Sequence, residues 1–296
     1  MRKSSKSYRF VSIVIPVYND AARLIKCLEA LSTQTYPHDL FEVIIVDNRS
    51  EDDIKSLVSQ FDCVKYAFES KPGSYAARNH GLSVARGDII GFTDSDCVPA
   101  PDWIENGAKK LLETNNCGLV AGRINFSFRN PERPTTAELY DSLTFLNQKH
   151  YVEIEHYGAT ANAFTFREVF EKVGLFDADL KSGGDRDWGK RVYTAGYQQV
   201  YASNVCITHP ARHSVKALKT KVVRVVEGQN ATDVSERKLL SAFTDFLKDA
   251  KPYLGYARSV LRNGEICSIG YKIGLIRIHI VLRYTRAWKK FQLSFR

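Results

Sequence analysis

The first half of the chain alternates short apolar, often β-branched runs with longer segments whose apolar residues repeat at helical spacing. The run at residues 43–46 is apolar throughout, which is typical of a strand buried on both faces of a sheet. Strands that alternate with helices predict a mainly parallel sheet with right-handed crossovers. We therefore expect an α/β fold with a Rossmann-like, mainly parallel sheet flanked by helices.

The expected elements of the first half are strands at 11–17, 42–47, 64–69, 88–93 and 119–128. Between them, helices are expected at 21–32, 52–61, 74–85 and 103–114. The second half is less regular, and its expected elements are a helix at 137–150, a pair of strands at 161–166 and 199–207, and a helix that starts near Asp185. From residue 215 onward the pattern is helical, with interruptions expected at Pro252 and Gly255.

Charge is distributed unevenly along the 296 residues. Residues 1–215 carry 25 Lys and Arg against 27 Asp and Glu, a net charge of −2, whereas residues 216–296 carry 17 against 6, a net charge of +11. We expect one domain over 1–215 and a basic helical C-terminal extension over 216–296. A basic extension on a nearly neutral body indicates contact with something anionic, either phospholipid or nucleic acid.

The extension has amphipathic segments. One apolar face is expected from Leu239, Leu240, Phe243, Phe246 and Leu247, and Ile273, Ile276, Ile280 and Tyr284 alternate with Lys and Arg. Such a segment can lie in the interface of an anionic membrane, or it can be an ordinary helix that packs on the body with a solvated basic face. Apolar runs long enough to span a bilayer are absent from the sequence, and the scattered cysteines favour a reducing compartment. We expect a cytoplasmic protein that contacts the inner face of the membrane.

Four of the expected strands end in polar clusters, at residues 15–20, 46–50, 73–81 and 91–96. In a parallel sheet these clusters converge on one edge, where ligands bind. Asp94 and Asp96 stand two residues apart and can share a divalent cation, because carboxylate oxygens suit Mg²⁺ or Mn²⁺ bound to a phosphate. Each residue alone has a plainer interpretation: Asp-x-Asp as a surface turn, Asp47 as a helix cap and Arg78 as a solvated side chain.

The order of the motifs is more specific than any one of them. Pro-Val-Tyr-Asn, Val-Asp-Asn-x-Ser, Ala-Arg-Asn-x-Gly and Asp-Ser-Asp follow successive strands, and in this order they resemble the family 2 glycosyltransferases, which have the GT-A fold. The resemblance covers residues 10–213. It implies an inverting transfer of a sugar from a nucleoside diphosphate donor to the hydroxyl of a saccharide or lipid-linked acceptor, in polysaccharide, glycolipid or cell-envelope assembly.

The resemblance also implies roles for individual residues. Pro16, Tyr18 and Asp47 would hold the base and the nearby ribose, and Arg78 would contact the base or a phosphate. Asp94 would lie near the ribose and the metal.

The implied cofactor is Mn²⁺ or Mg²⁺. Asp96 would bind this metal where it bridges the diphosphate, and Asp94 would lie beside it. In related enzymes a late histidine can complete the metal shell, which makes His209 a candidate ligand, with His213 as its competitor. A histidine at the end of a strand can also be purely structural.

A second cluster, at residues 181–191, resembles the family's Glu-Asp-x-Asp segment, in which the aspartate after the glutamate is the catalytic base. Asp185 matches that aspartate, although Gly184 stands where the glutamate is usual. Asp187 and Arg191 are four residues apart on the expected helix, which is the spacing of an ion pair. Residues 157–162 match the acceptor side of the family, where small side chains would let a sugar approach, or they simply form a turn.

Two other functions remain open from the sequence. A nucleotidyltransferase also uses aspartates at strand ends with Mg²⁺. Such an enzyme would need a Gly-rich, basic phosphate-binding loop after the first strand, and residues 17–20 do not form one. A nucleic-acid-binding module would use the basic extension, and the near-neutral charge of residues 1–215 counts against it. We therefore expect a glycosyltransferase with no nucleic-acid partner.

Overall fold

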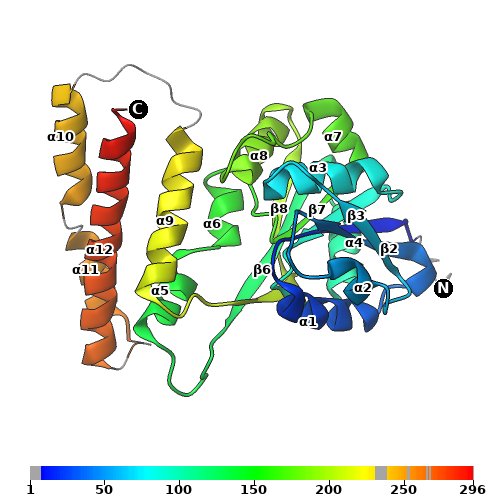
Figure 1. Ribbon diagram of the computed structural model, residues 1–296, viewed down its shortest axis with the longest axis horizontal. Helices are drawn as coiled ribbons and strands as arrows, with labels where there is room; N and C mark the ends of the chain where they lie inside the picture. Colours follow the sequence, from blue (N-terminus) through cyan, green and yellow to red (C-terminus); the bar gives the residue numbers. More distant parts are fainter. Residues whose placement is uncertain (1–7, 231–238, 252–253, 265, 267, 296) are drawn as a thin grey trace. The chain divides into compact units, whose positions relative to one another are not determined.

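The computed structural model describes residues 8–230, 239–251, 254–264, 266 and 268–295 (Figure 1). The chain divides into two compact units. The first consists of Met1–Asn125, Leu146–Leu180 and Gly184–His209, and the second of Phe126–Phe145, Lys181–Gly183 and Pro210–Arg296. The domain boundary expected between residues 215 and 216 stays a prediction.

In the described part of the chain, one eight-stranded sheet has the strand order β3-β2-β1-β4-β7-β6-β8-β5. Its parallel half consists of β1 (Val11–Val17), β2 (Phe41–Asp47), β3 (Val64–Phe68) and β4 (Ile89–Thr93). The other half consists of β5 (Val98–Pro99), β6 (Cys117–Ser127), β7 (Asn162–Phe166) and β8 (Gln198–Pro210). In that half, β7 runs antiparallel to both β4 and β6, and β5 runs antiparallel to β8.

The strands expected at 161–166 and 199–207 both form, as β7 and β8, but the expectation that they pair is wrong. The long strand β6 lies between them, although it precedes both in the sequence. The position of β6 in the sheet therefore does not follow the order of the strands along the chain. The first four strands and β6 agree with expectation to within about two residues, whereas the short β5 was not expected. The α/β fold is confirmed, with a sheet that is parallel in one half and contains antiparallel pairs in the other.

Helices cover both faces of the sheet (Figure 1). One face is covered by α1 (Ala21–Ser32), α2 (Ile54–Val58) and α4 (Trp103–Glu113), and the other by α3 (Ser74–Val84), α7 (Arg167–Val173) and α8 (Gly184–Thr194). The apolar run in β2 explains this layering, because successive side chains of a strand point to opposite faces. Val43 and Ile45 belong to the first core, and Ile44 and Val46 to the second.

The prediction of a single helix over residues 137–150 is wrong. The chain forms α5 (Thr136–Thr144) and α6 (Gln148–Glu153), separated by Leu146, whose φ is 57°. The side chain of Asn147 begins α6 by accepting a hydrogen bond from the His150 N–H at 3.1 Å. An asparagine that caps a helix competes with the continuation of the preceding one, and periodicity alone did not reveal this.

The second unit is helical. Its core contains side chains from α5, α9 (Val215–Asn230), α11 (Leu254–Arg262) and α12 (Ile269–Leu293), namely Ala137, Tyr140, Leu218, Val260, Leu275, Ile278 and Leu282. Phe246 of α10 (Leu239–Ala250) packs against Tyr284 and Trp288 of α12. The helical C-terminal extension is thus confirmed. Gly255 lies inside α11, so an interruption there is wrong, and Pro252 lies outside the described residues.

Glu42 is a buried carboxylate on β2 that ties three segments of the first unit together. Its side chain is 3% exposed, and its oxygens lie 2.6 Å from Lys65 Nζ, 2.7 Å from the Ser12 hydroxyl and 2.8 Å from the Arg86 backbone N–H. Burial raises the pKa of Glu42. The hydrogen bonds act more strongly in the opposite direction, and the pKa lies below its ordinary value of 4.5.

We expect Glu42→Gln to lower the free energy of unfolding by about 1–3 kcal/mol at pH 7, because a charged hydrogen-bond partner is lost in a buried place. A carboxylate with a depressed pKa in the folded state stabilises the fold above its unfolded pKa, and this contribution disappears as the pH falls through the folded pKa. Urea unfolding at pH 7 and pH 3 should therefore give a smaller difference from the wild type at pH 3.

Glu113→Gln is the matched control, since Glu113 is exposed and lies 3.9 Å from Lys109. Such a surface pair contributes at most about 0.5 kcal/mol. Equal effects of the two substitutions at pH 7 would contradict the role assigned to Glu42.

Candidate active site

The candidate site lies where the carboxyl ends of β1, β2 and β4 meet. After β1 the chain adds β2 and β3 on one side and then β4 on the other, and ligands bind at such a reversal of strand order. Asp47 is the last residue of β2 and pairs with Val17 of β1, and Asp94 directly follows β4. The residues expected to bind a nucleotide therefore share one edge of the sheet.

Three residues expected on the base and ribose side differ in exposure. Tyr18, after β1, is 63% exposed, Pro16 is half-buried within β1, and Asp47 is buried. Asp47 accepts hydrogen bonds from the Ser50 N–H at 2.9 Å and the Tyr66 hydroxyl at 3.1 Å.

The alternative that Asp47 caps the next helix is wrong. Asp53 begins α2 instead, by accepting a hydrogen bond from the Ser56 N–H at 3.0 Å. Asp47 is held in place by the loop that follows it and by β3, so its position does not depend on α2.

Asn48 is a buried residue of the site that sequence reasoning did not single out. Its amide donates to the carbonyls of Glu69 and Lys71 at 3.0 and 2.8 Å, and its side-chain oxygen accepts the Gly73 N–H at 2.7 Å. These bonds fix the turn before α3. Asn48 lies within a polar cluster of the sequence, but its partners are 21 to 25 residues away along the chain, so the sequence pattern gives no sign of them.

Arg78 and Asp94 form the central ion pair of the site. Arg78 Nη2 lies 2.5 Å from Asp94 Oδ1, and Arg78 is only 4% exposed. Its Nε is buried and has no hydrogen-bond partner among the residues that the structure describes. The interpretation of Arg78 as a solvated side chain is therefore wrong. A buried guanidinium beside one carboxylate is positioned to bind a further anion.

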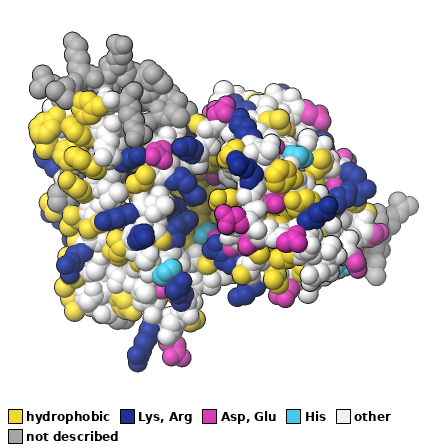
Figure 2. Space-filling model, viewed as in Figure 1, with side chains coloured by type: hydrophobic (Ala, Val, Ile, Leu, Met, Phe, Trp, Pro, Cys, Tyr) yellow, Lys and Arg dark blue, Asp and Glu magenta, His cyan; other side chains and the backbone are white. Residues whose placement is uncertain are grey.

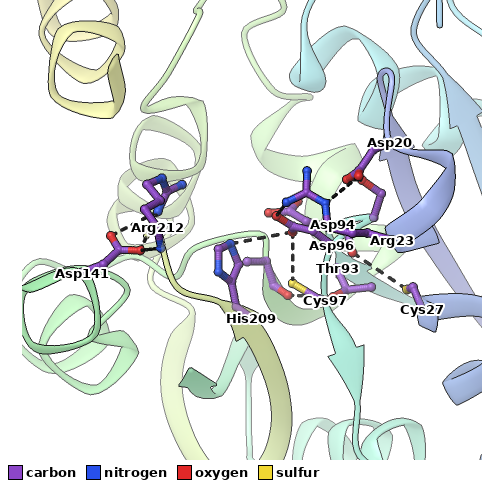
Figure 3. A network of polar contacts seen from close by, with 12 residues as sticks. Asp20, Arg23, Cys27, Thr93, Asp94, Asp96, Cys97, Asp141, His209 and Arg212 are labelled. Carbon is purple, nitrogen blue, oxygen red and sulfur yellow. Dashed lines mark hydrogen bonds and ion pairs between the residues drawn. The ribbon is translucent and has the colours of Figure 1, made fainter. Parts of the chain in front are cut away.

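Asp96 and His209 face each other across two strands (Figure 3). His209 Nε2 lies 3.7 Å from Asp96 Oδ1. The antiparallel pairing of Val98 with Thr208 accounts for this, because continuing the register places His209 opposite Cys97. Burial raises the pKa of Asp96, and the charge of Asp94 adds to that effect. His209 and Arg23 act in the opposite direction.

Arg23 is a further residue that sequence reasoning missed. Its guanidinium lies 2.6 Å from Asp20 Oδ1 and 3.4 Å from Asp96 Oδ2 (Figure 3). The Ser95 hydroxyl donates to the other oxygen of Asp20 at 3.0 Å. The three-residue spacing of Asp20 and Arg23 at the start of a helix is the sequence signal that could have indicated the pair. The link from α1 to Asp96 spans 73 residues and could not have been read in this way.

Asp96, Cys97 and His209 each place one ligand atom within 4.8 Å of the others. Burial raises the pKa of the Cys97 thiol well above its ordinary value, so Cys97 remains protonated and is a poor ligand for a hard cation. A carboxylate and an imidazole are suitable ligands for Mn²⁺, and a cation would offset the negative charge of the partly buried Asp96. His209 is the histidine of this group, whereas His213 is exposed and belongs to the second unit.

Asp185 lies in the first turn of α8, one residue after the helix begins, so it is not the N-cap. Its Oδ1 accepts hydrogen bonds from the Tyr75 hydroxyl at 3.2 Å and the Arg186 N–H at 2.9 Å. Burial raises the pKa of Asp185, and the nearby charge of Arg78 lowers it. The charge of Asp94 also raises this pKa. Asp185 therefore belongs to the same electrostatic cluster as the Arg78–Asp94 pair.

The packing around α8 explains why a glycine, Gly184, precedes Asp185. A Cβ on Gly184 would lie 2.8 Å from the ring of Tyr75, whereas the family pattern has a glutamate at this position. The ring of Tyr75 therefore occupies the space beside the helix start, and its hydroxyl supplies a hydrogen bond to Asp185.

Asp187 forms the expected ion pair, with its Oδ2 at 3.1 Å from Arg191 Nε. In the segment expected on the acceptor side, a Cβ on Gly158 would lie 2.8 Å from Ala121 Cβ. Ala159, Thr160 and Ala161 are buried. The small residues of this segment pack against the sheet, which favours the structural interpretation of them.

Comparison with known proteins extends these findings. Residues 12–174 match the family model of glycosyl transferase family 2. The chain is 41% identical over 225 residues to glycosyltransferase AglE of Haloferax volcanii, an alignment that covers 74% of this chain and 73% of that protein. It is 24% identical over 225 residues, 70% of this chain and 68% of the other, to the Methanococcus voltae dolichyl N-acetyl-alpha-D-glucosaminyl phosphate 3-beta-D-2,3-diacetamido-2,3-dideoxy-beta-D-glucuronosyltransferase.

The fold is similar to a solved structure, the mannosyltransferase PcManGT from Pyrobaculum calidifontis in complex with GDP-Man and Mn²⁺. The TM-score is 0.59 at 19% identity, over 98% of this chain and 74% of that one. This likeness confirms the GT-A fold. With the family match and the relative at 41% identity, it follows that the chain belongs to glycosyl transferase family 2 and is a glycosyltransferase that uses a nucleotide-sugar donor.

Proposed function

We propose that the protein is an inverting, divalent-metal-dependent glycosyltransferase that acts in polysaccharide, glycolipid or cell-envelope assembly. The observation that carries this proposal is the shared site of Asp94, Asp96, Arg78 and Asp185, in which two strand-end carboxylates lie beside a buried cation and a separate carboxylate. Such a set can bind a diphosphate on one side and accept a proton on the other.

The donor side would use the residues at the ends of β1 and β2. Pro16, Tyr18 and Asp47 would hold the base and ribose, since the exposed ring of Tyr18 and the fixed carboxylate of Asp47 border the same edge of the sheet. Arg78 would contact the base or a phosphate through its guanidinium, whose Nη2 also lies against Asp94.

Asp94, Asp96 and His209 would hold Mn²⁺ or Mg²⁺. When bound, such a cation stabilises the negative charge that develops on the leaving diphosphate. The positions of Asp96 and His209 support this assignment, because they bring a partly buried carboxylate and an imidazole together. Asp94 is not a member of that group, and its Oδ1 contacts Arg78. Arg23 would orient Asp96 from the α1 side, through its contact with Oδ2.

Asp185 would act as the general base. Its carboxylate takes the proton of the acceptor hydroxyl as the acceptor oxygen forms a bond to the anomeric carbon. The bond from that carbon to the diphosphate breaks in the same step, and its electron pair leaves with the nucleoside diphosphate. Because attack and departure take place on opposite sides of the carbon, the configuration of the sugar inverts. Tyr75 positions the base through its hydroxyl.

The metal-dependent donor site can be tested with Asp96→Asn. In the wild type, one nucleotide of a UDP-, GDP- and dTDP-sugar panel should raise the Tm in the presence of Mn²⁺, because a ligand that binds the native state stabilises it. The rise should disappear in excess EDTA and in Asp96→Asn. Asp62→Asn, at an exposed position outside the site, is the control and should behave like the wild type. An unchanged rise in EDTA would refute metal dependence.

The role of Asp185 can be tested with Asp185→Asn, which keeps the shape of the side chain but cannot accept the proton. Turnover should fall by roughly 10² or more, a typical contribution of a general base, while the Tm and the donor affinity stay close to those of the wild type. Asp187→Asn should instead lower the Tm through loss of the Arg191 pair and leave turnover near normal. If Asp185→Asn retained normal turnover, the base would be another residue.

Tyr75→Phe supplies a pH-dependent readout of the same role. The Tyr75 hydroxyl lowers the pKa of Asp185, so its removal should raise that pKa. A general base works in its deprotonated form, so the rate is full above the pKa and falls as the pH drops through it. The acid limb of the kcat–pH profile should therefore move to higher pH in Tyr75→Phe, whereas a purely structural tyrosine would leave the limb in place.

We also propose that the second unit contacts an anionic membrane, with the protein on the cytoplasmic side. No described helix has both the length and the hydropathy needed to cross a bilayer. Figure 2 shows hydrophobic side chains with Lys and Arg among them over α10 to α12. The exposed apolar side chains on α12 include Ile273, Ile280, Tyr284 and Trp288, at 40–53% exposure. A mixed apolar and basic surface suits the membrane interface. It would bring the enzyme to a lipid-linked acceptor.

Membrane contact can be tested with the double substitution Ile273→Ser and Tyr284→Ser. Cosedimentation with phosphatidylglycerol vesicles should weaken roughly tenfold relative to the wild type, because two half-exposed apolar side chains are lost, and wild-type binding should weaken with added salt. The control is Ile154→Ser with Leu175→Ser, which removes equally exposed apolar side chains from the first unit. Equal losses in the two variants would contradict a membrane surface on α12.

A further inference from the structure

A cavity of about 360 Å³ opens in the second unit beside the start of α9. Its volume lies at the small end of the range for ligand pockets, about 300–1,000 Å³. Four cationic and two hydroxyl side chains line it, Arg212, Lys216, Lys221, Arg224, Ser214 and Thr220.

The sequence of α9 explains the convergence. Lys216, Thr220 and Arg224 follow one another at intervals of four residues, so they lie along one side of the helix. Ser214 precedes the helix, and its Oγ accepts the Ala217 N–H at 3.2 Å. A hydroxyl that accepts one hydrogen bond can still donate another. The amino-terminal end of a helix also carries a partial positive charge.

In the described part of the chain, the four cations of the lining differ in their carboxylate contacts. Asp141 of α5 is fully buried, and both its carboxylate oxygens lie within 3.2 Å of Arg212 Nη1. Figure 3 shows this pair. Lys221 Nζ lies 3.9 Å from the same carboxylate. Glu227, further along α9, lies 2.7 Å from Lys289. Arg212 and Lys221 thus share the carboxylate of Asp141, whereas Lys216 and Arg224 are exposed and form no ion pair with any residue that the structure describes.

We propose that this cavity binds a phosphate or diphosphate group. Guanidinium groups match phosphate oxygens in pairs, lysines add point charge, and the Ser214 hydroxyl and the helix start supply further donors. All the lining residues belong to the second unit, and none of them is among the residues assigned to the donor site. The bound phosphate could come from two sources. One is the phosphate of a lipid-linked acceptor, and only this source rests on the proposed function. The other source is free phosphate.

The test is calorimetric titration of the full chain with inorganic pyrophosphate, in EDTA so that no metal is available to the donor site. The test variant is Lys216→Gln with Arg224→Gln, at two exposed positions of the lining. The control is Lys219→Gln with Arg277→Gln, which removes the same charge from exposed positions of α9 and α12 outside the lining. Binding should weaken at least tenfold in the test variant and less than twofold in the control.

A second titration distinguishes the sources. Farnesyl diphosphate that binds more tightly than pyrophosphate, with the same loss in the test variant, would support a lipid-linked phosphate, whereas equal binding of the two would support free phosphate. Equal losses in both double variants, or no binding of millimolar pyrophosphate by the wild type, would overturn the proposal. These titrations need no glycosyl transfer and no metal, so failure of the proposed function at Asp96 or Asp185 would leave their outcome unaffected.

Discussion

The contact between the buried guanidinium of Arg78 and Asp94 is the interaction on which the candidate site depends. It places a positive charge at the sheet edge where three carboxylates, Asp94, Asp96 and Asp185, would otherwise repel one another. α3 carries Arg78, β4 leads to Asp94, and α8 carries Asp185. Three elements that are distant in the sequence therefore meet through one cation. The same cation is suited to a diphosphate, which links the stability of the site to its proposed chemistry.

Much of the first unit could be predicted from the sequence because its strands are apolar on both faces. In β1, β2 and β4 this pattern is strong, and the observed strands match the expected ones closely. The antiparallel half could not be predicted in the same way. The place of β6 between β7 and β8 depends on tertiary pairing, and the break at Leu146 depends on an asparagine cap.

The site residues also fall into two groups, those in local sequence motifs and those that depend on tertiary contacts. Asp47, Arg78, Asp94 and Asp96 follow strands in recognisable motifs, and the structure brings them to one edge. Asn48, and the contact of Arg23 with Asp96, depend on partners far along the chain, which no local pattern marks. Tyr75 is the clearest example of a site residue whose role depends on tertiary packing. The missing glutamate before Asp185 was visible as Gly184 in the sequence, but only the packed ring explains what fills its place.

Family membership favours the glycosyltransferase over the nucleotidyltransferase that the aspartates alone left open. Within that family, the central claim is a single displacement assisted by Asp185. The most direct test is proton NMR of the first product formed from the nucleotide sugar that binds most tightly, with water or a saccharide as acceptor. The account predicts an anomeric configuration opposite to that of the donor. A product that retains the configuration of the donor would contradict it.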